Sequence, residues 1–189
     1  LDDDYLSFAI ELAEGALKNF YDEKNGGFFQ GEKRPDLVLR LKGQFDGAIP
    51  TESSVAVREF AILAEMTGRE EFRAIAGKTL KSYLPSMKEA PTGLSEMLSS
   101  FRFYLTKPPR LVLAGKEGRE ELLKVASGSY DPARITLGTE GPVSEFTAGL
   151  KPMDDKSTAY YCVGQSCQLP VNEAKALAAL LKRMTEESK

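Results

Sequence analysis

Apolar residues recur every three or four positions along five stretches of the chain, a spacing that predicts amphipathic helices. The predicted helices cover residues 4–21, 53–67, 69–87, 92–105 and 172–186. Residues 53–67 are apolar around most of the helix circumference, which indicates a buried inner helix, whereas residues 69–87 carry one apolar stripe, typical of an outer helix. The first four helices predict an α/α-hairpin segment over residues 1–107.

The pattern changes at Pro108 and Pro109, because shorter apolar runs follow them. These runs predict two buried strands, a helix between them and a β-hairpin. The strands are expected at 110–115 and 133–138, the helix at 116–127, and the hairpin at 158–164 with 166–171. Residues 108–189 therefore predict a small α/β subdomain. Within the first segment, Phe28 and Phe29 are predicted to pair with residues 37–41 in an extended conformation.

The charge and hydropathy of the whole chain exclude several classes of partner. The 189 residues carry a net charge of −3, and the lysines and arginines are spread along the chain, which disfavours nucleic-acid binding. No apolar run approaches the roughly 20 residues that a membrane span requires, so we expect a cytoplasmic protein with no membrane partner. The chain opens at Leu1 inside a helical pattern, which predicts a fragment of a longer protein.

The absence of histidine limits the chemistry that the chain can perform. Histidine is the commonest general base near neutral pH and the commonest metal ligand. Any reaction must rely on carboxylates, lysine, tyrosine, serine or cysteine. We therefore predict no metal site and no cofactor.

Three motifs occur in order along the chain, namely "YDEKNGGFF", "DGAIPTESSVA" and "AYYCVGQSCQLPV". Together they resemble the C-terminal part of the thioredoxin-domain-containing protein family, which includes spermatogenesis-associated thioredoxin-like proteins. The resemblance spans essentially the whole chain and implies a mainly α fold, the last hairpins of an (α/α)6 toroid, followed by the small α/β subdomain. Toroids of this kind are similar to N-acylglucosamine 2-epimerase and six-hairpin glycosidases. An incomplete ring exposes apolar flanks, which implies a homo-oligomer.

The resemblance implies two alternative functions. The first is a carbohydrate-binding or carbohydrate-converting cavity that takes a sugar or a sugar phosphate. The second is a non-catalytic scaffold that docks the thioredoxin-like domain of the full-length chain and carries a redox-responsive cysteine pair. Relatives that resemble the epimerase use histidines, and this chain has none, so whether it is an enzyme stays open.

Loops that enter inner helices line the cavity of a helical toroid, so the resemblance makes residues 40–54 the candidate ligand site. Asp46 and Glu52 are the candidate catalytic carboxylates. The candidate ligand-binding residues are Phe28, Arg40, Lys42, Phe45, Asp46 and Ser53. The alternative is structural, since Glu52, Ser53 and Ser54 have the residue types that cap a helix. The family's common Gly-Asn pair is replaced by Glu52-Ser53.

Cys162 and Cys167 are the only cysteines, and four residues separate them. A thioredoxin-type site requires a CxxC motif, and structural zinc requires four ligands. With Gly164 in a turn, the two residues face each other across a hairpin at a separation that a disulfide can bridge. The sequence leaves free structural thiols and a reversible disulfide open, and favours the thiols, which are the default in a cytosolic protein.

Overall fold

The computed structural model describes residues 3–187, and the chain divides into two compact units. Among the described residues, one unit comprises residues 4–106, and the other comprises residues 107–187 together with residue 3. In the described part, no helix is long and apolar enough to cross a membrane.

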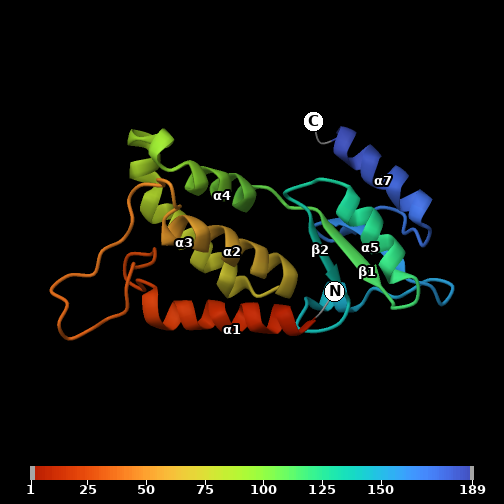
Figure 1. Cartoon of the computed structure of the whole chain (residues 1–189), viewed down its shortest axis with the longest axis horizontal. Coiled ribbons are helices and arrows are strands. Elements are labelled where there is room, and N and C mark those ends of the chain that lie inside the picture. Colours follow the sequence, from red (N-terminus) through yellow and green to blue (C-terminus); the bar gives the residue numbers. More distant parts are fainter. Residues whose placement is uncertain (1–2, 188–189) are drawn as a thin grey trace. The chain divides into compact units, whose positions relative to one another are not determined.

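The unit of residues 4–106 is helical (Figure 1). Its elements are α1 (Asp3–Phe20), α2 (Glu52–Thr67), α3 (Glu70–Glu89), the 3-10 helix η1 (Pro91–Gly93) and α4 (Ser95–Leu105). Helix α2 packs against both α3 and α4. Gly68 ends α2 in the left-handed conformation, with φ of 74°, and its N–H donates to the Ala64 carbonyl. This glycine lets the chain reverse directly into α3.

Aromatic rings and aliphatic side chains form the core between α2, α3 and α4. The Phe60 ring contacts the Phe72 ring edge to face, with centroids 5.5 Å apart, and stacks on Phe28 at 5.6 Å. Val57 and Met97 are fully buried in the same unit. Because α2 buries side chains toward two neighbouring helices, it has the wide apolar surface that the sequence predicts for residues 53–67.

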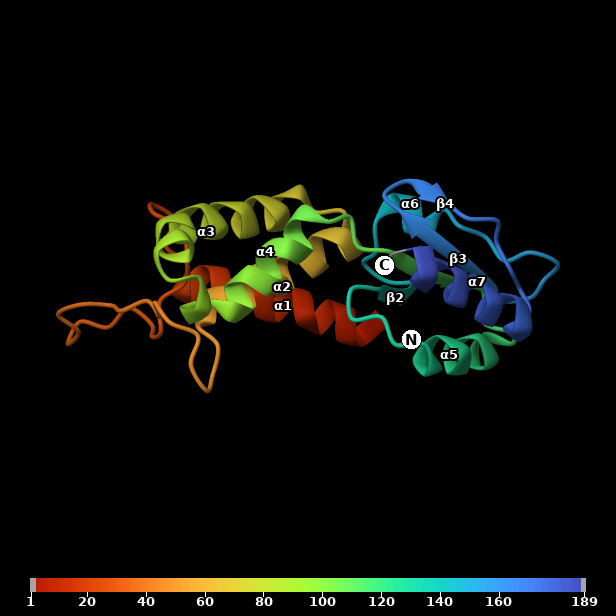
Figure 2. The same cartoon turned by 90° about the horizontal axis from the view of Figure 1, so that it is seen from above.

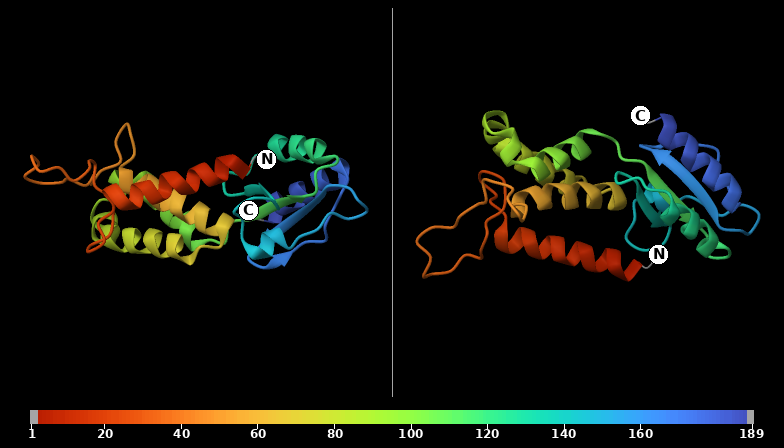
Figure 3. Two further views of the ribbon diagram at one scale, coloured as in Figure 1. Left: turned by 90° about the horizontal axis from the view of Figure 1, so that it is seen from below. Right: turned by 45° about the horizontal axis from the view of Figure 1, so that its top comes forward.

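Helix α1 places its main apolar stripe toward solvent. Tyr5, Phe8 and Leu12 recur at helical spacing and are all exposed, whereas Leu6 and Ala13 are buried. After α1, the chain runs away from the helices as a long loop before it returns at α2 (Figure 3). Phe28 and Phe29 do not pair with residues 37–41 in a strand within the described residues. Phe28 forms an isolated bridge with Tyr21.

The second unit contains a four-stranded sheet with helices (Figure 2). Its elements are β1 (Arg110–Ala114), α5 (Arg119–Gly128), β2 (Ile135–Gly138), α6 (Glu145–Ala148), β3 (Thr158–Val163), β4 (Ser166–Cys167) and α7 (Ala174–Glu187). The strand order is β2-β1-β3-β4, with β1 parallel to β2 and antiparallel to β3, and β3 antiparallel to β4. Strand β4 therefore forms one edge of the sheet.

Successive side chains of each strand point to opposite faces of the sheet, so its two faces carry different residues. On one face, Leu111, Leu113 and Tyr161 pack with apolar residues of α5 and α7. Helices α5 and α7 also contact each other over this face (Figures 1 and 3). The neighbouring residues Arg110 and Cys162 point to the opposite face, because side chains alternate along each strand.

The predicted fold class, a mainly α chain ending an (α/α)6 toroid, is wrong. Residues 3–187 form seven α-helices and a four-stranded mixed sheet, which is a mixed α/β structure. The physical reason is that the apolar runs after residue 108 pair into one sheet. The apolar side chains of α5 and α7 pack against this sheet and form a core with it. In the helical unit, α2, α3 and α4 bury their side chains against each other.

Candidate functional site

The carboxylate of Asp46 joins the beginnings of two helices. Its Oδ1 accepts the Thr51 N–H at 2.8 Å, and its Oδ2 accepts the Met97 N–H at 3.0 Å. Thr51 is the N-cap of α2, and Met97 lies in the first turn of α4. Only 7% of Asp46 is exposed. The side chain therefore satisfies backbone donors that neither helix can satisfy by itself.

Hydrogen bonds determine the ionisation of Asp46. Burial of the carboxyl group opposes its charged form, but the N–H groups of Thr51 and Met97 outweigh burial and lower the pKa of Asp46 below its ordinary value. The group is thus held as a carboxylate. A general acid requires the opposite shift, since it must hold a proton near neutral pH.

Glu52 and Ser53 also bond within the fold. Glu52 Oε1 accepts the Gly43 N–H at 2.5 Å, and Ser53 Oγ accepts the Phe28 N–H at 2.9 Å. The N-cap of α2 is Thr51, whose hydroxyl accepts the Ser54 N–H at 3.1 Å, so capping lies two or three positions before the predicted Ser53 or Ser54.

Arg40 and Lys42 border the ring of Phe29. The Arg40 guanidinium lies 4.0 Å from the ring centroid and donates to the Gly31 carbonyl. Lys42 Nζ lies 4.9 Å from the same centroid and donates to the Asp22 carboxylate at 2.7 Å. Both cations therefore hold the loop in place, a role that the sequence did not predict for them.

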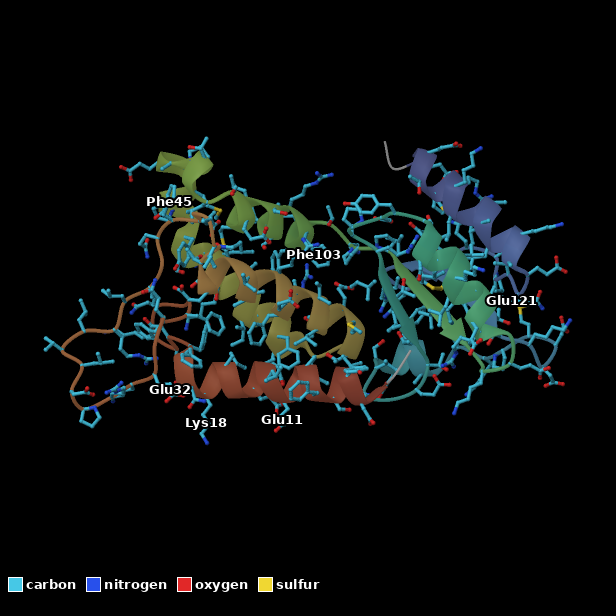
Figure 4. The ribbon with its side chains drawn as sticks, viewed as in Figure 1. Glu11, Lys18, Glu32, Phe45, Phe103 and Glu121 are labelled. Atoms are coloured by element: carbon cyan, nitrogen blue, oxygen red, sulfur yellow. A yellow bond between two sulfur atoms is a disulfide. The ribbon has the colours of Figure 1, made fainter. Side chains whose placement is uncertain are left out.

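Phe28 and Phe45, the two aromatic residues predicted to bind a ligand, lie in different environments. Phe28 is 3% exposed and contacts the rings of Tyr21 and Phe60, so it is part of the core. Phe45 is 67% exposed on the segment before α2 (Figure 4), and its ring lies against Gly93. Of the six predicted ligand-binding residues, Phe45 alone presents most of its side chain to solvent. A sugar site here stays a prediction.

Asp22 is a structural carboxylate that the sequence analysis missed. It accepts the Lys24 and Asn25 N–H groups at 3.0 Å each, in addition to Lys42. Burial disfavours its charge, but the Lys42 ammonium and the Asn25 donors outweigh burial and lower the pKa of Asp22 well below its ordinary value. The signal in the sequence is "YDEKNGG", since Asp before Asn-Gly favours a turn closed by its own carboxylate.

Stability of the helical unit is expected to depend on the charge of Asp22. Asp22→Asn should lower the free energy of unfolding by about 2 kcal/mol at pH 7, because Lys42 loses its charged partner and the backbone N–H groups of Lys24 and Asn25 keep only a neutral acceptor. The lowered pKa in the folded state means that the wild-type contribution is complete above the ordinary pKa near 4 and is lost as pH falls further. Urea unfolding measured between pH 7 and pH 2 should show that the free energies of unfolding of wild type and Asp22→Asn converge as the pH falls toward 2.

An exposed ion pair provides the control for this experiment. Asp36 pairs with Arg34, and both side chains are more than half exposed. Asp36→Asn should change stability by less than about 0.5 kcal/mol at any pH. A constant gap between Asp22→Asn and wild type down to pH 2 would contradict the role of the Asp22 charge.

Cys162 and Cys167 form a disulfide between β3 and β4. They are direct partners in the antiparallel ladder, and Gly164 opens the connecting two-residue turn with φ of 60°. A glycine at the first turn position with positive φ is the requirement of a type II′ turn. The predicted hairpin thus brings both sulfurs together, and the bond is the alternative that the sequence ranked below free thiols.

The two sulfur-bearing residues differ in exposure. Cys162 is fully buried, whereas Cys167 is partly exposed on the edge strand. The neighbouring apolar side chains Val163 and Leu169 are exposed by 46% and 87%. The two residues joined by the disulfide are therefore unequally exposed, with Cys162 enclosed by the protein and Cys167 partly open to solvent.

Arg110 is the second residue that sequence reasoning missed. It is the direct β1 partner of Cys162, so their side chains share one face of the sheet. Its guanidinium donates to the carbonyl of the turn residue Gly164 and lies 5.3 Å from the centroid of the Phe146 ring in α6. Arg110 itself is 6% exposed. The available signal was an arginine beginning the apolar run "RLVLA".

Within residues 3–187, no group of three or more His, Cys, Asp or Glu side chains is placed to hold a metal ion.

No protein-family model matches the chain. The chain is 26% identical, over 189 residues, to spermatogenesis-associated protein 20 of Homo sapiens and of Mus musculus, and 94% of it is aligned. It is 25% identical over 193 residues to an uncharacterized protein of Caenorhabditis elegans. The chain spans 24% to 26% of the length of these relatives. The similarity to the thioredoxin-domain-containing family is supported through spermatogenesis-associated protein 20, and these names specify no substrate.

Proposed function

We propose that this chain is a non-catalytic scaffold segment of a thioredoxin-domain-containing protein, and that its Cys162–Cys167 disulfide accepts electrons from the thioredoxin-like domain. The observation that carries this proposal is the bond itself, between direct partners of a short hairpin with Cys167 partly exposed. The similarity to spermatogenesis-associated protein 20 supports the choice of electron donor.

The proposed exchange is a two-electron reduction by a dithiol. One thiolate of the donor attacks a sulfur of the hairpin, and the other hairpin sulfur leaves with the bonding electron pair. The second donor thiol, after losing its proton, then attacks the mixed disulfide. The donor ends as a disulfide, and the hairpin ends with two thiols.

The hairpin also offers a surface on which a donor domain can dock. Strand β4 is the edge of the sheet, and a sheet edge presents backbone groups to which another chain can bind. Val163 at the end of β3 and Leu169 just after β4 add exposed apolar side chains to the hairpin. A donor bound here would contact the partly exposed Cys167.

The carbohydrate alternative has weaker support from the geometry. Asp46 and Glu52 both accept backbone N–H groups inside the fold, and the low pKa of Asp46 keeps it from acting as a proton donor near pH 7. The scaffold proposal requires neither carboxylate.

Thiol titration provides the test of the disulfide. We expect the unfolded, unreduced protein to show no reactive thiol, and the protein treated with dithiothreitol to show two that appear together. Cys167→Ser is the control and should show one thiol under both conditions. Closing so short a loop stabilises the native state by about 2 kcal/mol in the chain-entropy model, so hydrogen exchange in β4 should accelerate on reduction.

Two reactive thiols in protein that has never met a reductant would exclude the proposed function. Resistance of the native disulfide to any dithiol would exclude it as well, because the bond would then be purely structural.

A further inference from the structure

We propose that Cys167 is the sulfur that an incoming thiolate attacks, and that Arg110 favours this direction by stabilising the thiolate that leaves on Cys162. This inference rests on the proposed function and assigns separate roles to the two sulfurs and to a residue on the neighbouring strand.

Exposure selects the attacked sulfur. A thiolate must approach its target along the S–S axis from the outer side, so the sulfur reached from solvent is the one attacked. Cys167 is partly exposed on the edge strand, while Cys162 is completely buried between β1 and β4. Attack on Cys167 forms a bond between the donor sulfur and Cys167, and the electron pair of the broken S–S bond goes to Cys162.

Burial alone would make Cys162 a poor leaving group. An apolar environment raises the pKa of a thiol, and a thiol with a higher pKa leaves more slowly. The strand register supplies the compensating charge, since Arg110, Cys162 and Cys167 are successive direct partners across β1, β3 and β4. Their side chains therefore lie in one row on one face of the sheet.

The guanidinium of Arg110 is fixed in this row by contacts with two other segments. It donates to the Gly164 carbonyl in the turn that joins the two cysteine strands, and it stacks near Phe146 of α6. Only 6% of the residue is exposed, so solvent screens its charge weakly. A buried cation near a thiol lowers the pKa of that thiol, and the strand register places the Arg110 side chain next to that of Cys162 on one face of the sheet.

The other charged groups around the hairpin come from three segments. Lys107 precedes β1, and its Cδ lies 3.8 Å from the place that a Cβ on Gly164 would take. Arg183 of α7 donates to the side chain of Gln168. Glu145 begins α6, next to Phe146, and is exposed. Lys107, Arg183 and Glu145 are all exposed, so Arg110 is the buried charge in this set.

Adduct mapping on the wild-type chain tests the direction of attack. The oxidised protein is treated with glutathione, quenched with iodoacetamide and digested for mass spectrometry. We expect glutathione on Cys167 and the alkyl group on Cys162. Glutathione mainly on Cys162 would overturn the assignment while leaving the proposed function intact. No adduct on either sulfur, together with resistance to dithiothreitol, would instead remove the proposed function.

Thiolate titration tests the role of Arg110. In the Cys167→Ser variant, the ultraviolet absorbance of the Cys162 thiolate is followed against pH, with the cysteine-free double variant as the blank. Arg110→Gln should raise the midpoint by about one pH unit, which is a tenfold smaller thiolate population below the midpoint. Arg110→Lys keeps a positive charge and should shift the midpoint by less than half as much.

Exchange kinetics provide a readout that a purely structural role would not change. With both cysteines present, Arg110→Gln should slow reduction by dithiothreitol several-fold, and Arg110→Lys should restore most of the rate. Far-ultraviolet circular dichroism confirms folding of each variant, and the adduct map on the wild-type chain stands even if Arg110→Gln does not fold. Equal midpoints and equal rates in folded Arg110→Gln and wild type would overturn the role of Arg110.

Discussion

Replacement of Asp46 by alanine is expected to lower the free energy of unfolding of residues 4–106 by about 4 kcal/mol. The carboxylate accepts the Thr51 and Met97 N–H groups, and it is 7% exposed, so water cannot replace it fully. Each bond to a charged acceptor contributes about 1.5 to 3 kcal/mol, and removing the acceptor leaves two buried donors unpaired. Urea unfolding combined with hydrogen exchange in α2 and α4 measures the loss in this unit.

Asp36→Ala is the matched control, because it removes an aspartate whose ion pair with Arg34 is exposed on both sides. We expect a change below about 0.5 kcal/mol. Asp46→Asn should lie between the two, since an amide oxygen still accepts one N–H but without charge. A loss of stability below about 1 kcal/mol in Asp46→Ala would show that Asp46 does not join α2 and α4, and would reopen its assignment as a ligand-binding carboxylate.

The sequence predicted the helices well because their signals are local. Gly68 and the apolar spacing around it predict the α2–α3 reversal, and the structure places the ends of α2 at Glu52 and Thr67. The strands after Pro109 were also predicted from short apolar runs. The fold class was wrong because it came from a resemblance, and apolar spacing does not reveal how strands and helices share one core.

The exposed face of α1 is a second case in which apolar spacing does not predict tertiary packing. Tyr5, Phe8 and Leu12 have the spacing of a buried stripe, yet all three are exposed in this chain. Spacing predicts which residues share a helix face, but burial depends on what packs against that face.

Sequence reasoning selected residues of the loop before α2 as the candidate site, but it did not reveal what their side chains contact. Asp46 and Glu52 were selected as polar residues before a buried helix, and the structure shows that both accept backbone donors. Arg110 was missed because its significance depends on strand register, which pairs it with Cys162. Register is fixed by long-range pairing, and no local pattern reveals it.

Replacement of Gly26, in the turn after α1, by alanine should lower the free energy of unfolding of the helical unit by about 4 kcal/mol. Gly26 has φ of +79°, which costs a residue with a Cβ about 1 to 2 kcal/mol. A Cβ there would lie 2.7 Å from the backbone oxygen of Lys78 in α3, so the turn or the helix would have to move. That movement would also disturb the bond from Lys42 to the Gly26 carbonyl.

Gly15→Ala is the matched control because it makes the same substitution in α1, where a Cβ would meet nothing within 4 Å. Alanine is the better helix former, so Gly15→Ala should raise the free energy of unfolding by about 1 kcal/mol. The added methyl group is the same in both variants. Opposite signs of the change in free energy of unfolding would therefore show that the loss in Gly26→Ala arises from the contact between the turn and α3. If Gly26→Ala stays within about 1 kcal/mol of wild type, the turn does not pack on the α3 backbone. The position of Asp22 and Lys42 beside it would then have to be revised as well, because both bond to this turn.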